Sequence, residues 1–394
     1  MKLIKLMMLV SLPFPGLSFA ELTSDSWDVD TRYSYDRSSS TYSDTTTKKS
    51  ASINLTLDGD IDKSTNINGI FTLDKVDTNS AGTLRFDDVD FVRQLYTSHT
   101  TNDGTEIKIG KQVSNYDSKK AIQDLGIYGG FCNPLVKKIC DGVLSLYVKK
   151  DIDENTKLEF LVGDIDTIQD SKGRQYATHI KHKRGVNEYH LTLSKLDSTT
   201  LYKYSSGQYS HTQTGNRESS RISLAVEIED TGKDKYYIAH SRRVGDSNET
   251  IAVIDTLDLS NEMSSYATTS KFEDESLTLG KIVFFDELLM RVNINRSKWS
   301  AKFSNETINI LLLTGSTLTG GDVHFEYPLE SGRISSRHGY FVSNDKAIIG
   351  SQLHNRVEIT YDLLKNLSST LSYYSNNSSQ HHANNLSFEI THAF

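Results

Sequence analysis

The chain has little proline, little cysteine and no long hydrophobic run beyond its first twenty residues. Only four prolines occur in 394 residues. A large hydrogen-bonded sheet selects against proline, because proline lacks the N–H that a ladder needs. No later stretch approaches the roughly 18 consecutive apolar residues that a membrane helix requires. These absences exclude a helical membrane protein and favour a backbone that is mostly paired in strands.

The first twenty residues have the three parts of a secretory signal peptide. Lys2 and Lys5 precede an apolar stretch at 6–17, and small residues stand before the expected cut after Ala20. Removing this segment takes two of the 43 basic residues and none of the 51 acidic ones, so 41 minus 51 leaves a formal charge of -10. We therefore expect an exported protein, with one domain at 21–394, that does not bind nucleic acid.

The two cysteines, Cys132 and Cys140, stand close together in the sequence. An exported chain meets an oxidising compartment, so we expect a local disulfide that staples a loop. A metal or redox pair is the alternative. The sequence brings no further cysteine and no neighbouring histidine to such a pair.

Apolar and polar side chains alternate along much of the chain with the period of two that β-strands have. Near the start, Trp27, Val29 and Tyr33 share one face, and Asp28 and Arg32 share the other. Stretches rich in Ser, Asn, Asp and Gly separate the alternating segments, as hairpin turns and loops do. The sequence predicts an all-β protein whose strands have one apolar face and one polar face.

The number of alternating segments distinguishes between two all-β architectures. A soluble two-sheet sandwich also alternates, but it rarely needs about twenty strands. A closed barrel takes an even number of strands, and 21–394 at about 20 to 24 residues per strand and connection gives 16, with 18 as the alternative. A polar lumen also accounts for a hydrophobic content of only 36%. We therefore predict a transmembrane antiparallel β-barrel.

The C-terminal segment 386–394 places apolar or aromatic side chains at nearly every second position and ends on Phe394. This resembles the terminal strand of Gram-negative outer-membrane barrels, in which the final aromatic residue is recognised by the barrel assembly machinery. The resemblance implies a location in the cell outer membrane, reached through the periplasm. It also implies contact with the lipid bilayer and with lipopolysaccharide.

A narrower resemblance, over residues 86–150, is to the general diffusion porins. The segments that carry it are Phe91–Tyr96, Gly104–Gln112 and the pair Tyr116 and Asp117. In that family a long external loop follows the fifth strand and folds into the barrel to constrict it. Here that loop is 113–141. The resemblance implies a homotrimer and a water-filled channel for passive diffusion of small hydrophilic solutes and ions.

By this resemblance, the pore constriction lies between the barrel wall and the long loop. The residues that it implies there are Arg93 on the wall, Asp117 and Asp124 on the loop, Tyr147 and Lys149 on the sixth strand, and Arg32 on the polar face of the first segment. If Arg93 faces the lumen, strand alternation turns Gln94 and Tyr96 outward. The alternative is that Arg93 is a solvated residue at a strand end.

Other classes of function leave weaker traces in the sequence. An outer-membrane enzyme needs a nucleophile and a base in a recognisable setting, and none of the 12 histidines stands in one. We therefore predict no catalytic residue and no cofactor. The pair His381 and His382 lacks evident further metal ligands, so we predict no metal site. Two alternatives stay open: a substrate-specific channel of 18 strands, and an adhesin or surface-receptor barrel of about eight to twelve strands.

Overall fold

The structure is a computed structural model in which part of the chain is described. The described residues are 27–40, 43–78, 92–112, 143–167, 171–206, 209–230, 234–254, 263–306, 315–343, 351–378 and 382–393. Outside these ranges lie the predicted signal peptide, Asp117, Asp124, Cys132, Cys140 and Phe394. No helix in the described ranges is long and apolar enough to cross a membrane.

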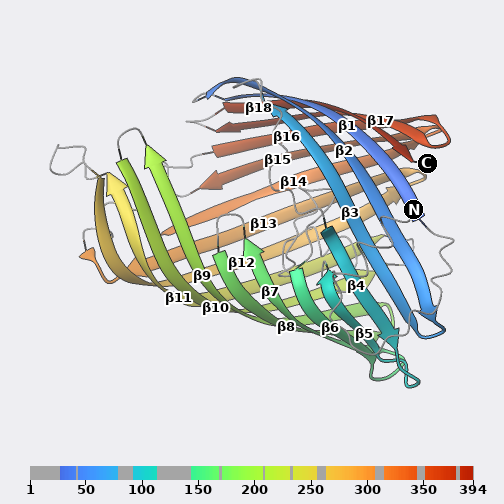
Figure 1. Ribbon diagram of the computed structural model, residues 1–394, viewed down its shortest axis with the longest axis horizontal. Helices are drawn as coiled ribbons and strands as arrows, with labels where there is room; N and C mark the ends of the chain where they lie inside the picture. Colours follow the sequence, from blue (N-terminus) through green and yellow to red (C-terminus); the bar gives the residue numbers. More distant parts are fainter. Residues whose placement is uncertain are drawn as a thin grey trace, which may run out of the picture.

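Eighteen β-strands make up the described part of the chain (Figure 1). They are β1 Trp27–Ser40, β2 Ser43–Asp62, β3 Thr65–Thr78, β4 Val92–Thr100, β5 Glu106–Gln112, β6 Val143–Asp151, β7 Thr156–Thr167, β8 Ser171–Arg184, β9 Asn187–Ser206, β10 Tyr209–Glu229, β11 Lys235–Ile254, β12 Met263–Phe285, β13 Leu288–Phe303, β14 Gly315–Leu329, β15 Gly332–Ser343, β16 Ser351–Leu364, β17 Leu367–Ser378 and β18 His382–Ala393.

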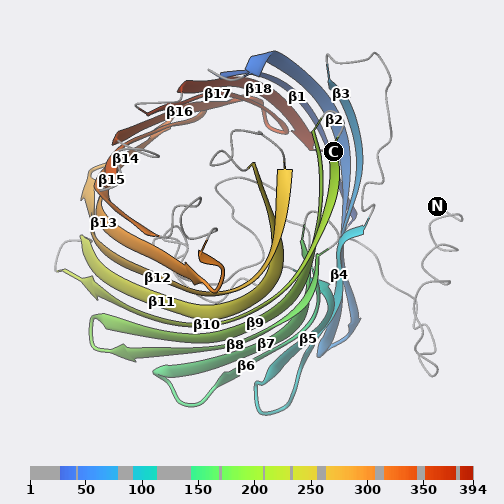
Figure 2. The ribbon, with the colours of Figure 1, turned by 90° about the vertical axis from the view of Figure 1, so that its left-hand side faces the viewer.

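Each strand pairs antiparallel with its neighbours in the sequence, and β1 pairs with both β2 and β18. The sheet therefore curls into a ring (Figure 2). The prediction of 16 strands is not met in the described residues, and the alternative of 18 agrees with them. The reason is that the connections at one end are very short, for example two residues between β12 and β13. More strands then fit into the same length of chain.

One end of the ring carries only short turns, of two to five residues, together with the start of β1 and the end of β18 (Figure 1). Gly104, Gly185 and Asp286 adopt positive φ in these turns, the backbone conformation that tight hairpins require. The longer connections lie at the other end. The predicted constriction loop does follow β5, but residues 113–142 lie outside the described residues.

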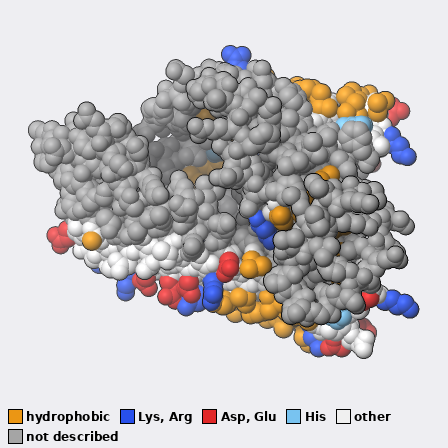
Figure 3. Space-filling view, viewed as in Figure 1, with side chains coloured by type: hydrophobic (Ala, Val, Ile, Leu, Met, Phe, Trp, Pro, Cys, Tyr) orange, Lys and Arg blue, Asp and Glu red, His pale blue; other side chains and the backbone are white. Residues whose placement is uncertain are grey.

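The two faces of the sheet differ in chemistry. Large apolar side chains are exposed on the outer surface, where Figure 3 shows them gathered toward the short-turn end. Among them are Phe160 of β7, Leu193 of β9, Leu224 of β10, Ile238 of β11 and Ile294 of β13. The alternate positions face inward and are largely polar and buried. The predicted alternation of an apolar and a polar face is thus confirmed for these strands.

The outward direction of Tyr96, expected if Arg93 faces the lumen, is not what the structure has. Tyr96 faces the inside of the ring, because Lys108 Nζ lies 5.9 Å from the centre of its ring and 5.4 Å from that of Tyr147. The cause is an irregularity in β4, where Val92 pairs with Phe71 while Gln94 pairs with the preceding residue of β3. An extra residue on one strand shifts the alternation by one position. That extra residue is Arg93, whose side chain lies outside the description.

Candidate functional site: the inner wall

A chain of hydrogen bonds crosses four neighbouring strands on the inner wall. The hydroxyl of Tyr147 on β6 donates to Glu159 Oε1 on β7 at 2.8 Å. Glu159 Oε2 lies 2.6 Å from His179 Nδ1 on β8, and His179 Nε2 lies 3.2 Å from His190 Nδ1 on β9. His190 Nε2 in turn lies 3.0 Å from Glu188 Oε1. Strand register brings these side chains together, since Glu159 pairs directly with His179.

This chain is sealed from solvent. His179 is 0% exposed and Glu159 1%, and the two imidazole rings stack with their centres 5.4 Å apart. Lys181 Nζ adds a cation 3.1 Å from Glu188. Buried carboxylates are tolerated only when they are paired in this way, so the chain ties the four strands together.

A basic row lines the inner wall on the other side of the ring. Arg291 of β13 pairs with His324 of β14, His324 with Arg337 of β15, and Arg337 with Arg356 of β16. By the order of pairing, β7 and β16 are half a ring apart. The basic row therefore lies across the ring from the strands that carry Glu159 and Glu188.

Carboxylates hold parts of the basic row in place. Arg337 donates to both oxygens of the buried Asp322, from Nε at 2.9 Å and from Nη2 at 3.2 Å. Arg356 donates to Glu358 Oε2 at 3.0 Å. A bidentate pair fixes the plane of the guanidinium. The arginines are thus presented as an ordered surface.

A third cluster lies closer to the loop end of the ring, on β10 to β12. Arg243 Nε donates to Asp274 Oδ1 at 2.8 Å, and its Nη2 donates to the second oxygen. The guanidinium of Arg217 lies 4.0 Å from the centre of the Phe272 ring, and that of Arg243 lies 5.6 Å from it. Cation–π contacts of this kind hold arginines against the wall.

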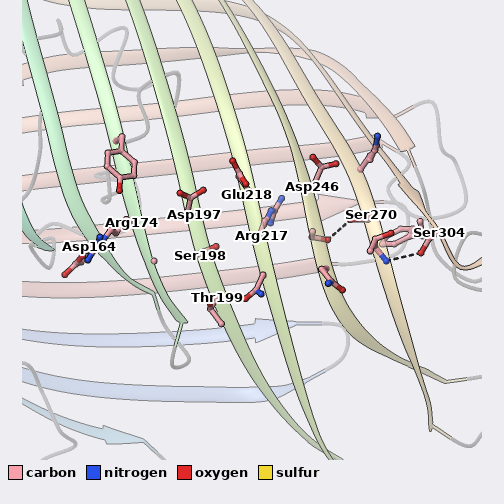
Figure 4. Close-up of a pocket in the computed structure, with 18 of the residues that line it drawn as sticks. Asp164, Arg174, Asp197, Ser198, Thr199, Arg217, Glu218, Asp246, Ser270 and Ser304 are labelled. Carbon is pink, nitrogen blue, oxygen red and sulfur yellow. Dashed lines mark hydrogen bonds and ion pairs between the residues drawn. The ribbon is translucent and has the colours of Figure 1, made fainter.

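Beyond the apolar band, the strand ends form a large charged hollow of about 1590 Å³ (Figure 4). Strand register places Asp197, Glu218, Asp246 and Lys271 in one row across β9 to β12. In Figure 4 the side chains of Asp197, Glu218 and Asp246 point the same way from neighbouring strands. These side chains lie on the outer face of the strands, the same face that carries the exposed apolar residues nearer the turns. The outer surface is therefore apolar near the turns and charged near the loops.

The predicted constriction residues are placed only in part. Tyr147 and Lys149 share the inner face of β6, and Tyr147 is 5% exposed. Arg32 lies in β1, where its backbone pairs with Thr391, and Arg93 lies in β4. The side chains of these two arginines are outside the description. Asp117, Asp124 and the predicted Cys132–Cys140 disulfide also fall outside the described residues.

Sequence reasoning missed the inner-wall residues that the structure brings together. Glu159 stood on the polar side of an alternating segment, which is a signal for an inward position. Its pairing with His179 depends on the register between β7 and β8, which the local pattern does not contain. Within the described ranges, no group of three His, Cys, Asp or Glu is arranged to hold a metal ion.

No protein-family model and no curated protein matches the chain. Among solved structures, its fold is similar to Pseudomonas aeruginosa OpdQ, at 8% identity over 93% of this chain and 98% of that one, with a TM-score of 0.55. It is also similar to Pseudomonas aeruginosa OpdK, solved with vanillate, at 10% identity over 94% and 99%, with a TM-score of 0.54. A third is OccK5 (OpdH) of the same organism, at 10% identity over 96% and 100%, with a TM-score of 0.53. The chain thus shares the fold of these three proteins.

Proposed function

We propose that the chain forms a water-filled channel through the outer membrane, by which small hydrophilic solutes and ions diffuse passively. One observation carries this proposal: the ring of strands has exposed apolar side chains outside and charged side chains inside. A barrel dissolved in water exposes polar side chains on its outer surface, whereas a barrel in lipid exposes apolar ones. A lipid-embedded ring whose inner wall is charged encloses water. Barrels of 16 to 18 strands are wide enough to leave an aqueous passage.

The width of the pore selects solutes by size, and the charges of the inner wall select them by charge. Solutes pass between the basic row of Arg337 and Arg356 and the strand that carries Lys149, with Tyr147 buried in the wall beside Lys149. Following the resemblance to general porins, Arg93, Arg32, Asp117 and Asp124 complete the constriction. The protein catalyses no reaction in this proposal. It needs no cofactor.

A substrate-specific channel is the second candidate. The ordered basic row favours it, because arginines fixed by Asp322 and Glu358 offer a defined track for an anionic solute. OpdK, which shares the fold, was solved with vanillate, an organic anion. The two candidates differ in kinetics: general diffusion rises in proportion to solute concentration, whereas a specific site saturates.

Membrane placement follows from the outer surface. The apolar band of β7 to β13 lies in the bilayer, and the row of Asp197, Glu218, Asp246 and Lys271 lies among the lipopolysaccharide headgroups. The protein is exported through the periplasm, loses its signal peptide after Ala20 and is inserted by the barrel assembly machinery through its last strand. It assembles as a homotrimer, and a Cys132–Cys140 disulfide staples its longest loop.

The test is conductance in a planar lipid bilayer with the purified mature protein. A general porin gives large, stable steps, in groups of three for a trimer, and its current grows linearly with salt. A specific channel gives small steps that a particular solute blocks. An adhesin or receptor barrel gives folded protein with no steps at all.

A further inference from the structure

The outward side chains of β13 change from apolar to basic toward the loop end of the ring. Ile294 is 61% exposed, and the next two outward positions carry Arg296 and Lys298, which are also exposed. On the neighbouring strand β14, Gly321 pairs with Ile294 and Thr319 pairs with Arg296, so β14 offers no charge at this level. Two cations therefore stand directly beyond the exposed apolar surface, and we call Arg296 and Lys298 the lower basic pair.

The acidic side chains on the other side of β13 are held by β11. Glu275 of β12 lies across from Lys298 in the strand pairing, but its Oε1 atom is 2.9 Å from His240 Nε2, and Lys298 acts on it only at longer range. Glu273 Oε1 accepts a hydrogen bond from Arg242 Nε at 2.8 Å. In the part of the chain that the structure describes, the lower basic pair therefore forms no close ion pair of its own.

A second pair of cations lies further toward the loops. Lys271 of β12 and Lys302 of β13 are directly opposite each other and exposed, and we call them the upper basic pair. Like charges in this position repel each other and destabilise a sheet. Asp246 of β11 pairs with Lys271 from the other side, but one carboxylate does not neutralise two ammonium groups. At about 3.4 Å per residue, the stretch from Lys298 to Lys302 separates the two pairs by about 14 Å along β13.

This outer face has a net positive charge. From His240 toward the loop end, the described outward side chains of β11 to β14 include five basic ones and three acidic ones. They are Arg242, Lys271, Arg296, Lys298 and Lys302, and Asp246, Glu273 and Glu275. Five minus three leaves +2, with His240 counted as neutral, whereas the whole chain has a formal charge of -8. The face therefore attracts anions in a protein that is acidic overall.

We propose that this face binds the headgroup of one lipopolysaccharide molecule, a sugar unit that carries phosphates and acyl chains. The inference rests on the proposed placement in the outer membrane, in which the short turns face the periplasm and the loop end faces the outer leaflet. A lipid on this face lays its acyl chains against the exposed apolar band and its phosphates against the cations beyond that band. A soluble anion without acyl chains uses only the second of these surfaces.

Each part of the face has a partner in such a headgroup. Arg296 donates two parallel hydrogen bonds to one phosphate, and Lys298 adds a compact charge beside it. The upper basic pair holds a second phosphate, which removes the repulsion between Lys271 and Lys302. Thr319 exchanges a hydrogen bond with a sugar hydroxyl. A phospholipid with one phosphate and no sugar leaves the upper pair without an anion.

Equilibrium binding of lipid A to the folded, delipidated protein in neutral detergent tests the proposal on the wild type. We expect saturable binding of the diphosphoryl form. The monophosphoryl form is expected to bind about fivefold more weakly, because one basic pair then lacks its anion, and phosphatidylcholine at least about tenfold more weakly, because it has no net charge. Equal affinity for the three lipids would contradict recognition of phosphates by the two pairs.

Two double variants probe the two pairs separately. Arg296→Gln with Lys298→Gln removes the lower pair and is expected to raise the half-saturating concentration of diphosphoryl lipid A about tenfold or more. Lys271→Gln with Lys302→Gln removes the upper pair and is also expected to raise it, which provides a second test if the first variant does not fold. Heat-modifiable migration on gels checks the folding of each variant.

Arg174→Gln with Lys195→Gln is the matched control. These residues also face outward near the loop end, on β8 and β9, but each has an acidic partner. Arg174 Nε lies 3.7 Å from Asp164 Oδ1, and Lys195 Nζ lies 2.5 Å from Glu218 Oε1. The control removes the same two positive charges and is expected to weaken the binding of lipid A far less. Equal weakening in the control and in the two double variants would overturn the inference.

The outcomes also separate the lipid site from the channel. Conductance steps in a phosphatidylcholine bilayer, without any binding of lipid A, contradict the lipid site while the channel stands. Binding of lipid A by a folded protein that gives no steps contradicts the channel while the lipid site stands. If the double variants change the oligomeric state in detergent but not the binding of lipid A, the face contacts a second copy of the chain and the inference is wrong.

Discussion

At the scale of single residues, the inner wall places ionisable groups where solvent does not reach them. His179 and Glu159 are held by each other, by Tyr147 and by His190. Such a set stabilises the fold only as a whole, because removal of one partner leaves a buried charge or dipole without compensation. Replacement of any one side chain of the network is therefore expected to destabilise the wall.

We predict that His179→Ala lowers the free energy of unfolding by about 3–5 kcal/mol, because it strands the buried carboxylate of Glu159. Urea unfolding in detergent micelles, followed by tryptophan fluorescence, measures the loss. His240→Ala is the control, since His240 pairs with Glu275 on the outer surface with both side chains partly exposed. Exposed pairs contribute about 0.2–1 kcal/mol. Equal losses in the two variants would contradict the buried network.

We also predict that Arg337→Gln shifts the selectivity of the channel toward cations, because it removes a positive charge from the basic row. The reversal potential in a salt gradient measures this shift. Arg296→Gln removes an equal charge from the outer face of β13, where the residue is exposed. It is expected to shift the reversal potential less. A larger shift from Arg296→Gln would place the permeation path elsewhere.

The sequence allowed Tyr147 and Lys149 to be placed on the same face of one strand, because alternation is a local property. The direction of Tyr96 could not be predicted, since it depends on the irregularity at Arg93. The partners of Glu159 and Arg337 depend on register between strands. Register is set by the packing of the whole ring and by turn geometry, so it was not predictable from one segment.

At the scale of elements, strands approach closely where glycine lies between larger side chains. Gly280 of β12 stands between Tyr237 of β11 and Asn293 of β13, and the tyrosine hydroxyl reaches across it to donate to Asn293. A Cβ at this position would lie 2.1 Å from Tyr237 Cζ. Only glycine lets the aromatic ring lie flat over the strand.

We predict that Gly280→Ala destabilises the barrel by about 1–3 kcal/mol, because it displaces the ring of Tyr237. Tyr237→Phe removes the hydrogen bond but keeps the ring over the strand, and it is expected to cost about 1 kcal/mol. Thermal unfolding of both variants makes the comparison. A harmless Gly280→Ala together with a damaging Tyr237→Phe would show that the ring does not pack over this glycine.

The short turns carry their own ion pairs. In the turn between β4 and β5, a hydrogen bond from Lys150, with smaller ones from Thr101 and Thr105, holds the pKa of Asp103 well below its usual range. The distance from Lys150 Nζ to Asp103 Oδ2 is 2.8 Å. Because the pKa of Asp103 is lower in the folded state, this turn stabilises the fold at pH values above the pKa of the same group in the unfolded chain, about 3.9.

We predict that this contribution is lost progressively as the pH falls below about 4, because the unfolded chain then binds a proton that the folded turn excludes. The melting temperature of the wild type minus that of Asp103→Asn measures it, at pH 7 and at pH 3. The difference is expected to be small and positive at pH 7 and to shrink at pH 3. A difference that grows at low pH would have the wrong sign.

At the scale of the whole molecule, the sequence predicted the fold class, the hairpin order and the two chemically different faces. It underestimated the number of strands, because the turns are shorter than the average connection used to divide the chain. Alternation gives each strand an apolar face and a polar face, and pairing between β1 and β18 makes these the outside and the inside of a ring. The chemistry of the inner wall follows only from which strands become neighbours.

The central claim is that the ring encloses water and conducts. Planar bilayer recording of the folded, mature protein tests it most directly. We predict discrete conductance steps whose size rises with salt concentration and whose selectivity responds to Arg337→Gln. A heat-modifiable, fully folded protein that inserts into the bilayer and yields no steps would contradict the claim.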